Sequence, residues 1–351
     1  MRAPLLPSDF HFDLPSELIA QTPAERRDAA RLLVLNRADD ALTHAHVGEL
    51  PNFLRAGDLL VVNDTRVIPA RIFGRSASGG AVELLLVRSV TSAPNERDWL
   101  CLGKPARRLR VGAEIAFPDH VRASVVAAHG DGRYTVAFDA TVDVSVFLSR
   151  HGEIPLPPYI RRPDGPLPLD QTRYQTVFAC APGAIAAPTA GLHFTERLID
   201  LLRARDVDVA RLTLHVGPGT FLPVRCEDLH HHVMDPEWCE ISEVTATAIR
   251  RAKAAGGRVV AVGTTTTRAL ESAASDEAVV EAGMRWADRF IVPGDRFRVI
   301  DALFTNFHLP GSTLLLLVSA FAGRERVLAT YIEAVRRRYR FYSYGDAMLI
   351  Q

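Results

Sequence analysis

Lysine is almost missing from this chain, and charge of neither sign dominates it. Only Lys104 and Lys253 are lysines among the 41 positively charged residues, and the rest are arginines. The 41 acidic residues balance them, so the formal net charge is +0. A polybasic protein that coats nucleic acid is therefore not expected, although local basic faces fit this balance. The four cysteines include no CxxC pair, so we expect free thiols in a reducing compartment.

Long apolar runs are also missing. The longest, Leu314–Ala322, is far shorter than the roughly 20 residues that span a bilayer. Residues 1–15 hold prolines and acids where a signal peptide needs an apolar core. We therefore expect a cytoplasmic protein without a membrane partner. The 48% of hydrophobic residues provides ample core, and 351 residues favour more than one domain.

The chain changes its pattern twice. Between about residues 72 and 139, short apolar strands alternate with glycine-containing turns, and helical periodicity is almost absent. Such a segment predicts a small closed β-barrel. On either side of it, buried-strand runs alternate with helices. We therefore predict an α/β fold, in which a layered α/β main domain (residues 1–73 and 156–351) is interrupted by a small inserted all-β barrel domain (residues 74–155).

Helix ends are marked by capping residues. Thr195 is placed to cap a helix that runs to Arg205, and Ser242 to cap another that runs to Lys253. The segment 313–338 predicts two helices that are broken near Gly323.

Two glycine-containing turns follow predicted strands. In Val262–Glu271, free backbone N–H groups, threonine hydroxyls and a helix start meet, which suits a carboxylate or a phosphate. In His215–Phe221, Gly217 and Gly219 permit a close approach of the backbone to a ligand. A capped helix start and a tight turn, respectively, are the alternatives without a ligand.

Histidines and polar side chains occupy three further turns. His193 precedes the Thr195 cap, where the positive end of the helix dipole disfavours a charged imidazole, so a neutral His193 is able to act as a base. Asn63–Arg66 follows an apolar strand, and Thr305–Thr313 carries Asn306 and His308 ahead of an apolar helix. Ligands of open α/β sheets bind at the carboxyl ends of strands. A structural histidine, an Asx turn and a helix cap are the alternatives.

Arginines and aromatic residues adjoin near the C-terminal end of the sequence. Arg336–Arg338 and Arg340 precede Phe341–Tyr344, so the arginines are candidates to grip phosphates and Tyr342 to stack on a base. A solvated helix end followed by a packed strand is the alternative. Lys104 is unusual in a chain that otherwise uses arginine, which hints at a need for a compact ammonium group.

A metal site is not expected. Zinc sites use closely spaced pairs such as CxxC. The candidate ligands between residues 226 and 239 lack that spacing; they are Cys226, His230, His231, His232 and Cys239.

The order of these segments resembles one known family, the S-adenosylmethionine:tRNA ribosyltransferase-isomerase (QueA) family. The resemblance extends over essentially the whole chain. It is carried by residues 9–21 and 31–35, VNDTRVIPAR (62–71), GEIPLPPYI (152–160), YQTV (174–177), APTAGLHFT (187–195), HVGPGTF (215–221), VGTT (262–265), TNFHLP (305–310) and YRFYSYGDAM (339–348). Asp235 stands where that family usually has a second histidine, so no catalytic role is assigned to it.

The resemblance implies an enzyme of queuosine synthesis with an α/β body and an inserted barrel. Such an enzyme transfers and isomerises the ribosyl group of S-adenosylmethionine onto 7-aminomethyl-7-deazaguanine at the wobble position of tRNA, giving epoxyqueuosine, adenine and methionine. S-adenosylmethionine is then a substrate, and no cofactor or metal is implied. We expect a monomer whose partners are that tRNA and S-adenosylmethionine.

The chemistry of this reaction assigns candidate roles. A base must remove the proton beside the sulfonium, and the attacking amine must be neutral. The catalytic candidates are His193, as the first choice, and Asp64, His215 and His308. The substrate-binding candidates are Asn63, Arg66, Lys104, Thr189, Gly217, Gly219, Thr264, Thr265, Arg268 and Asn306. The tRNA-binding candidates are Arg336, Arg337, Arg338, Arg340 and Tyr342.

Three other classes remain possible from the residues alone. A non-enzymatic RNA-binding protein explains the barrel and the basic clusters, but not the glycine and histidine turns. A metallohydrolase explains the histidines and predicts bound zinc. A methyltransferase shares S-adenosylmethionine and predicts S-adenosylhomocysteine as the product.

Overall fold

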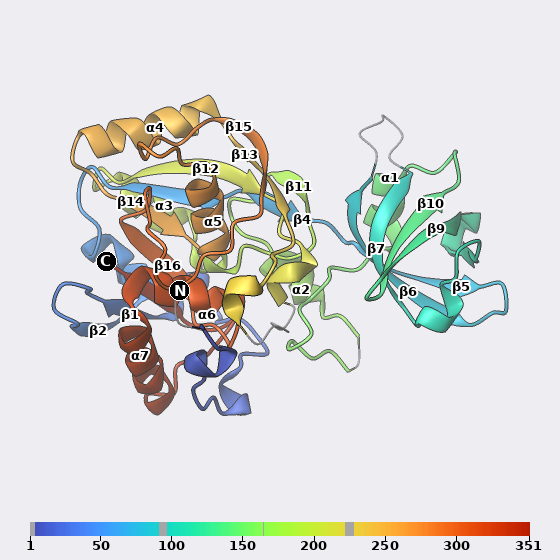
Figure 1. Ribbon diagram of the computed structural model, residues 1–351, viewed down its shortest axis with the longest axis horizontal. Helices are drawn as coiled ribbons and strands as arrows, with labels where there is room; N and C mark the ends of the chain where they lie inside the picture. Colours follow the sequence, from blue (N-terminus) through green and yellow to red (C-terminus); the bar gives the residue numbers. More distant parts are fainter. Residues whose placement is uncertain (1–3, 91–96, 164, 222–227) are drawn as a thin grey trace.

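The protein consists of an α/β body and a β-barrel, and the computed structural model describes residues 4–90, 97–163, 165–221 and 228–351. Within these ranges the body contains a nine-stranded sheet in the order β15-β13-β12-β3-β14-β16-β17-β1-β2 (Figure 1). Its strands are β1 (Arg31–Leu35), β2 (Leu42–His46), β3 (Leu59–Asn63), β12 (Asp208–Leu214), β13 (Glu237–Ile241), β14 (Val259–Val262), β15 (Gly283–Ala287), β16 (Ala302–Asn306) and β17 (Ala347–Ile350). A short pair, β4 (Thr65–Val67) and β11 (Ala181–Ala184), lies beside it.

Both faces of this sheet are buried, because every residue of its central strands β3, β14 and β16 is buried, and most of these residues are apolar. Along β3, Leu59 and Val61 pack into one hydrophobic cluster, whereas Leu60 and Val62 pack into the other. Strands buried on both faces are typical of parallel sheets, and β12, β3, β14 and β16 are parallel neighbours. The body is therefore a layered α/β structure, as the sequence predicts.

Helices cover the sheet and begin where the sequence predicts. Thr195 caps α3 and Ser242 caps α4 through side-chain hydrogen bonds, and α6 and α7 are separated at Gly323. Residues of α4 to α7 belong to the larger cluster, and residues of α3 to the smaller one. The helices are α1 (Val144–His151), α2 (Pro168–Arg173), α3 (Glu196–Arg203), α4 (Glu243–Ala254), α5 (Thr264–Ser272), α6 (Thr313–Ala322) and α7 (Arg324–Arg336).

The inserted segment closes into a barrel with the strand order β10-β7-β6-β5-β8-β9. Its strands are β5 (Arg71–Ser76), β6 (Ala81–Ser89), β7 (Asp98–Lys104), β8 (Glu114–Ala116), β9 (Arg122–Gly130) and β10 (Arg133–Phe138). Helix α1 packs Val144, Phe147 and Leu148 into the same core. The first strand begins at Arg71, a little before the expected boundary at residue 74.

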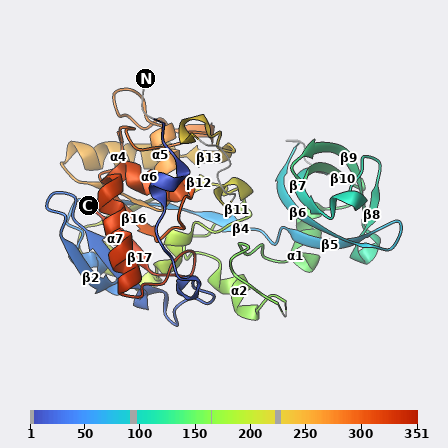
Figure 2. The same ribbon diagram turned by 60° about the horizontal axis from the view of Figure 1, so that its bottom comes forward.

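The barrel stands to one side of the body, and Figures 1 and 2 show it connected through the region of β4. The chain crosses between the two parts before β5 and again after α1, where Arg71 and Glu153 form an isolated antiparallel bridge. Two side-chain contacts also link them. Arg133 of the barrel pairs with Asp235 of the body at 2.6 Å, and the guanidinium of Arg88 lies over the ring of Trp286.

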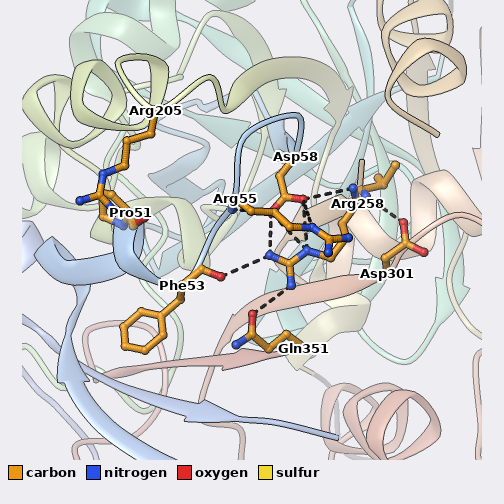
Figure 3. A network of polar contacts seen from close by, with 9 residues as sticks. Pro51, Phe53, Arg55, Asp58, Arg205, Arg258, Asp301 and Gln351 are labelled. Atoms are coloured by element: carbon orange, nitrogen blue, oxygen red, sulfur yellow. Dashed lines mark hydrogen bonds and ion pairs between the residues drawn. The ribbon is translucent and has the colours of Figure 1, made fainter. Parts of the chain in front are cut away.

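One edge of the main sheet is closed by a polar network (Figure 3). Asp58, just before β3, accepts hydrogen bonds from the side chain and the backbone N–H of Arg258, just before β14. Arg258 also donates to Gln351, which follows β17, and Asp301, just before β16, accepts from the backbone of β14. These residues join the amino ends of the parallel strands, so their carboxyl ends lie at the other edge.

No helix in the described residues is long and apolar enough to cross a membrane. Cys101, Cys180 and Cys239 are free thiols. Cys226 and Leu222 lie outside the described residues.

Candidate active site

Polar turns collect at the carboxyl edge of the parallel strands. Strands β12, β3, β14 and β16 end next to one another, and they are followed by His215, Asp64, Gly263 and Phe307. Four of the segments singled out in the sequence thus meet at one edge, which is where open α/β sheets bind ligands.

A first cavity, which we call the inner cleft, opens at this edge and has a volume of about 30 Å³. Gly263 and the first residues of α5 form one wall, and Asn306 and His308 form another. Gly263 has φ 93° and ψ 155°, a conformation that is almost restricted to glycine. This backbone aims the start of α5 at the cleft. The cleft is lined by Ala187, Pro188, Thr189, Ala190, Val216, Gly263, Thr264, Thr265, Thr305, Asn306, His308, Leu314, Tyr342 and Ser343.

Two buried histidines adjoin the inner cleft. His193 lies behind it: its Nε2 is 3.0 Å from Nδ2 of Asn306, which lines the cleft. Because this amide nitrogen donates, His193 Nε2 is the acceptor and the ring is neutral. Burial lowers the pKa of His193 to about 4, opposed by the charge of Asp346 and assisted by Arg340. Burial is the largest cause of this shift.

His308 lies in the wall of the inner cleft itself. Its Nε2 is 3.0 Å from the hydroxyl of Thr305, and its backbone N–H donates to the hydroxyl of Tyr331. Burial lowers the pKa of His308 to about 3. The ring is therefore neutral at physiological pH.

A second cavity, the interdomain cleft, lies between the barrel and the body and has a volume of about 470 Å³. Its body side comes from the ends of β12, β13 and β15, and its barrel side from β6, β7 and β10. Val216 lines both clefts, so the two cavities adjoin. The lining residues are Val87, Arg88, Leu100, Cys101, Leu102, Arg133, Gly183, His215, Val216, Gly217, Pro218, Asp235, Pro236, Glu237, Trp238, Trp286 and Asp288.

His215 has a defined orientation in the interdomain cleft. Its ring stacks on Trp238 with centroids 4.9 Å apart, and its Nδ1 is 2.8 Å from the hydroxyl of Thr65. That hydroxyl also lies 3.5 Å from the carbonyl oxygen of Ala181, and when it donates there it accepts from Nδ1–H, which leaves the lone pair of the ring on Nε2. A Cβ at position 183 would lie 2.6 Å from Nε2 and 2.7 Å from Cε1, so only glycine fits against the His215 ring at this position. Burial lowers the pKa of His215 to about 4.

A buried ion pair lies beside both clefts. Arg268, from α5, pairs with Glu237, from β13, and Glu237 also accepts from the backbone N–H of Gly217 at 2.8 Å. Burial lowers the pKa of Arg268 to about 10, and the charge of Asp288 opposes this shift. Arg268 thus holds the glycine turn in place through Glu237. Arg268 does not line the inner cleft but lines a small neighbouring hollow with Thr264 and Thr265, and its expected carboxylate-binding role stays a prediction.

Besides His193 and Arg268, five other catalytic or substrate-binding candidates line neither cleft. Asn63 is buried and bonds the backbone of Leu214, which ties β3 to β12. The carboxylate of Asp64 accepts from Thr213 at 2.7 Å. Arg66 is exposed on β4, and Gly219 packs near Asp235. Lys104 pairs with Glu83 on the barrel at 2.9 Å, which accounts for its ammonium group without a substrate.

The arginine cluster is only partly exposed. Arg336 and Arg337 both pair with Glu333, and Arg338 is exposed. They lie at the end of α7, on the side of the body away from the barrel in Figures 1 and 2. Arg340 is instead partly buried and donates to the carbonyls of Thr22 and Tyr344.

Tyr342 is not a surface residue beside those arginines. Its ring is buried against Tyr159 and lines the inner cleft. The prediction that it stacks on an RNA base at the arginine cluster is therefore wrong, because the chain turns inward after Arg340.

The sequence matches the profile described as "Queuosine biosynthesis protein" over residues 7–350. The chain belongs to this family. A relative from Citrifermentans bemidjiense, named S-adenosylmethionine:tRNA ribosyltransferase-isomerase, is 55% identical over 344 residues, which are 98% of this chain and 99% of that protein. A relative of the same name from Gloeobacter violaceus is 52% identical over 357 residues, covering 100% of this chain and 98% of that protein.

A solved structure agrees with this membership of the queuosine biosynthesis family. The crystal structure of S-adenosylmethionine tRNA ribosyltransferase from Thermotoga maritima matches with a TM-score of 0.55 at 36% identity, covering 98% of this chain and 100% of that chain. The resemblance inferred from the motifs and the layered α/β fold with an inserted barrel are thus confirmed.

The sequence does not predict most of the residues that line the interdomain cleft. Trp238, Trp286, Arg88, Glu237 and Asp288 were not among the predicted residues. An available signal was the alternation in EWCEI and GMRWA, which places large side chains on one face of two short strands. Among the described residues, no group of three or more His, Cys, Asp or Glu side chains is arranged to hold a metal.

Proposed function

We propose that this protein is an S-adenosylmethionine:tRNA ribosyltransferase-isomerase of queuosine synthesis. It transfers and isomerises the ribosyl group of S-adenosylmethionine onto 7-aminomethyl-7-deazaguanine at the wobble position of tRNA, and adenine and methionine leave. The observation that carries the proposal is the match to relatives of that name along 98–100% of the chain. The two adjoining clefts support it, since the reaction brings together a small molecule and a macromolecule.

The inner cleft is suited to the methionine end of S-adenosylmethionine. Thr264 and Thr265, the first residues of α5, line it, and the free backbone N–H groups and hydroxyls of such a helix start complement a carboxylate. Its other polar groups, among them Asn306 and His308, are uncharged. No metal or separate cofactor enters this proposal, because the sulfonium of the substrate activates the neighbouring carbon itself.

His215 is the side chain best placed to accept a proton. It is neutral, its Nε2 carries a lone pair, and it lines the larger cleft directly. His193 is buried behind Asn306, so we assign it to positioning that amide rather than to proton transfer. Asp64 is engaged by Thr213 and lines neither cleft.

The test is to incubate the protein with S-adenosylmethionine and tRNA that carries 7-aminomethyl-7-deazaguanine. Mass spectrometry of the small molecules and of the digested nucleosides is expected to show free adenine, methionine and epoxyqueuosine. Release of S-adenosylhomocysteine would instead identify a methyltransferase. Loss of activity with a chelator would identify a metal-dependent enzyme.

A tRNA substrate also supports the expected cytoplasmic location. The monomeric state stays a prediction, to be checked by light scattering coupled to size exclusion. The predicted roles of Arg336, Arg337 and Arg338 in binding tRNA phosphates also stay predictions. They can be checked by measuring how tRNA affinity depends on salt in variants that lack these arginines.

A further inference from the structure

An aromatic shelf, made of His215, Trp238 and Trp286, runs along the body side of the interdomain cleft. Trp238 and Trp286 are directly opposite each other on β13 and β15, so their side chains project from the same face. The ring of His215 continues the row by stacking on Trp238. Trp286 is nevertheless 50% exposed, and Met284 on the same face is 69% exposed. The fold thus leaves a large flat ring uncovered at the cleft, although burial of that ring would stabilise it.

The barrel supplies the opposite side of this shelf. Arg88 of β6 places its guanidinium carbon 5.4 Å from the centroid of the Trp286 ring. Arg88 is exposed and its side chain is long, so it is able to move aside or to cover a second ring. An aromatic ring on one side and a guanidinium plane on the other are the two surfaces on which RNA-binding proteins stack unpaired bases.

An acidic group lies at one end of the shelf. Glu237 is opposite Ala287 in the strand pair, so Asp235 before β13 and Asp288 after β15 lie at the same end. Asp235 is already paired with Arg133. Asp288 is exposed and, within the described ranges, has no cationic side chain within 4 Å, although its charge acts on the buried Arg268. Its carboxylate is therefore available to a cation in the cleft.

We infer that the interdomain cleft receives the modified base itself, turned out of the anticodon loop. The inference rests on the proposed function and assigns a place to its second substrate. The deazaguanine ring stacks on Trp286, and its aminomethyl group, an ammonium when the RNA binds, faces Asp288, whose carboxylate accepts the proton that the amine must lose before it attacks. S-adenosylmethionine then lies beyond Val216, in the inner cleft. Charge and shape both favour this occupant, since it combines a flat ring with an ammonium group.

The first experiment measures binding of a short anticodon stem-loop RNA in the absence of S-adenosylmethionine. Its wobble position carries either 7-aminomethyl-7-deazaguanine or no base. Trp286→Ala is expected to weaken binding of the base-bearing RNA roughly 5–150-fold, the range for one lost base–aromatic stack. Binding of the abasic RNA is expected to change less than about 2-fold. Trp286→Phe should restore most of the affinity, and Val244→Ala, an exposed apolar residue that lines neither cleft, is the matched control.

The second experiment tests the acidic end of the shelf. Asp288→Asn is expected to weaken binding of the aminomethyl RNA about 2–5-fold, as for an exposed charge pair. The same RNA with plain 7-deazaguanine should not distinguish this variant from the wild type. An equal effect on both RNAs would overturn the placement of the ammonium group.

Two results would overturn the inference as a whole. If Trp286→Ala weakened abasic and base-bearing RNA equally, Trp286 would contact another part of the RNA. If it weakened S-adenosylmethionine binding in calorimetry and left RNA binding intact, the cleft would hold S-adenosylmethionine. Neither result bears on the proposed function, which fails only if the wild-type protein releases no adenine.

Discussion

Single side chains at the two clefts differ in what they are able to contact. His215 lines the interdomain cleft directly, whereas His193 reaches the inner cleft only through Asn306. We predict that His215→Gln lowers turnover roughly 10²–10⁴-fold, as expected for a lost general base, with little change in S-adenosylmethionine affinity. His193→Gln should act mainly on KM for S-adenosylmethionine. Rapid-quench measurement of adenine release at several S-adenosylmethionine concentrations separates an effect on turnover from one on KM. If His193→Gln lowered turnover and His215→Gln changed only KM, His193 would be the base.

The same histidines predict a pH dependence of stability. Burial lowers the pKa of His193 and His215 to about 4 and that of His308 to about 3, below the value of about 6.5 in an unfolded chain. Between these values the unfolded chain binds more protons than the folded one. The contribution of these histidines to the free energy of unfolding should therefore be greatest above about pH 6.5 and should decrease as the pH falls toward 4. Urea titrations at several pH values measure it. His308→Gln should make the free energy of unfolding depend less steeply on pH. The control His231→Gln, at an exposed position, should leave that dependence unchanged.

Among the secondary-structure elements, α5 depends most on its first residue. Gly263 adopts a conformation that costs other residues about 1–3 kcal/mol. Gly263→Ala is expected to lower stability by about that amount and also to weaken S-adenosylmethionine binding, because the start of α5 shifts. Gly323, at the start of α7, has a similar φ of 89° and lines neither cleft. Gly323→Ala should therefore reduce stability alone, as urea unfolding and calorimetry with S-adenosylmethionine would show. Equal binding losses in both variants would contradict a role for α5 in the site.

At the amino ends of the parallel strands, away from the clefts, we predict a loss of stability without a loss of S-adenosylmethionine binding. Burial raises the pKa of Asp58, but hydrogen bonds from Arg258 and the backbone of Arg55 outweigh it, so the net shift is downward. Asp58→Asn leaves Arg258 without its charged partner and should cost about 3 kcal/mol of unfolding free energy. Asp200→Asn, in an exposed pair with Arg203, should change it by less than about 0.5 kcal/mol. Weaker substrate binding by Asp58→Asn would mean that the network supports the clefts.

The molecule as a whole is built from two parts with separate cores. We predict that limited proteolysis cuts first in the exposed turn at residues 76–80 or in the segment 161–168, and later in the body. Mass spectrometry of the early fragments measures this. Early cleavage within Val259–Glu271 would contradict it, because these residues form a buried strand and helix of the body.

The sequence predicts the fold better than it predicts the site. Alternating patterns and caps such as Thr195 and Ser242 act locally, so the helices, the barrel and the edge where the turns meet could be predicted from neighbouring residues. The site depends on contacts between distant segments. Nothing near Tyr342 in the sequence shows that its ring turns inward, and nothing near Lys104 shows that Glu83 neutralises it. The pairing of Trp238 with Trp286 likewise requires the register of two strands that are far apart in the chain.

The position of β17 has a consequence for how the protein is made on the ribosome. This strand, at residues 347–350, lies inside the sheet, between β16 and β1. During synthesis from the amino end, β1 and β2 must therefore wait for almost the entire chain before they join the other strands. The barrel strands all lie within residues 71–138 and are able to pair much earlier. A nascent or prematurely terminated chain would thus carry a finished barrel beside an unfinished body, in which Tyr342 and Ser343 had not yet completed the inner cleft.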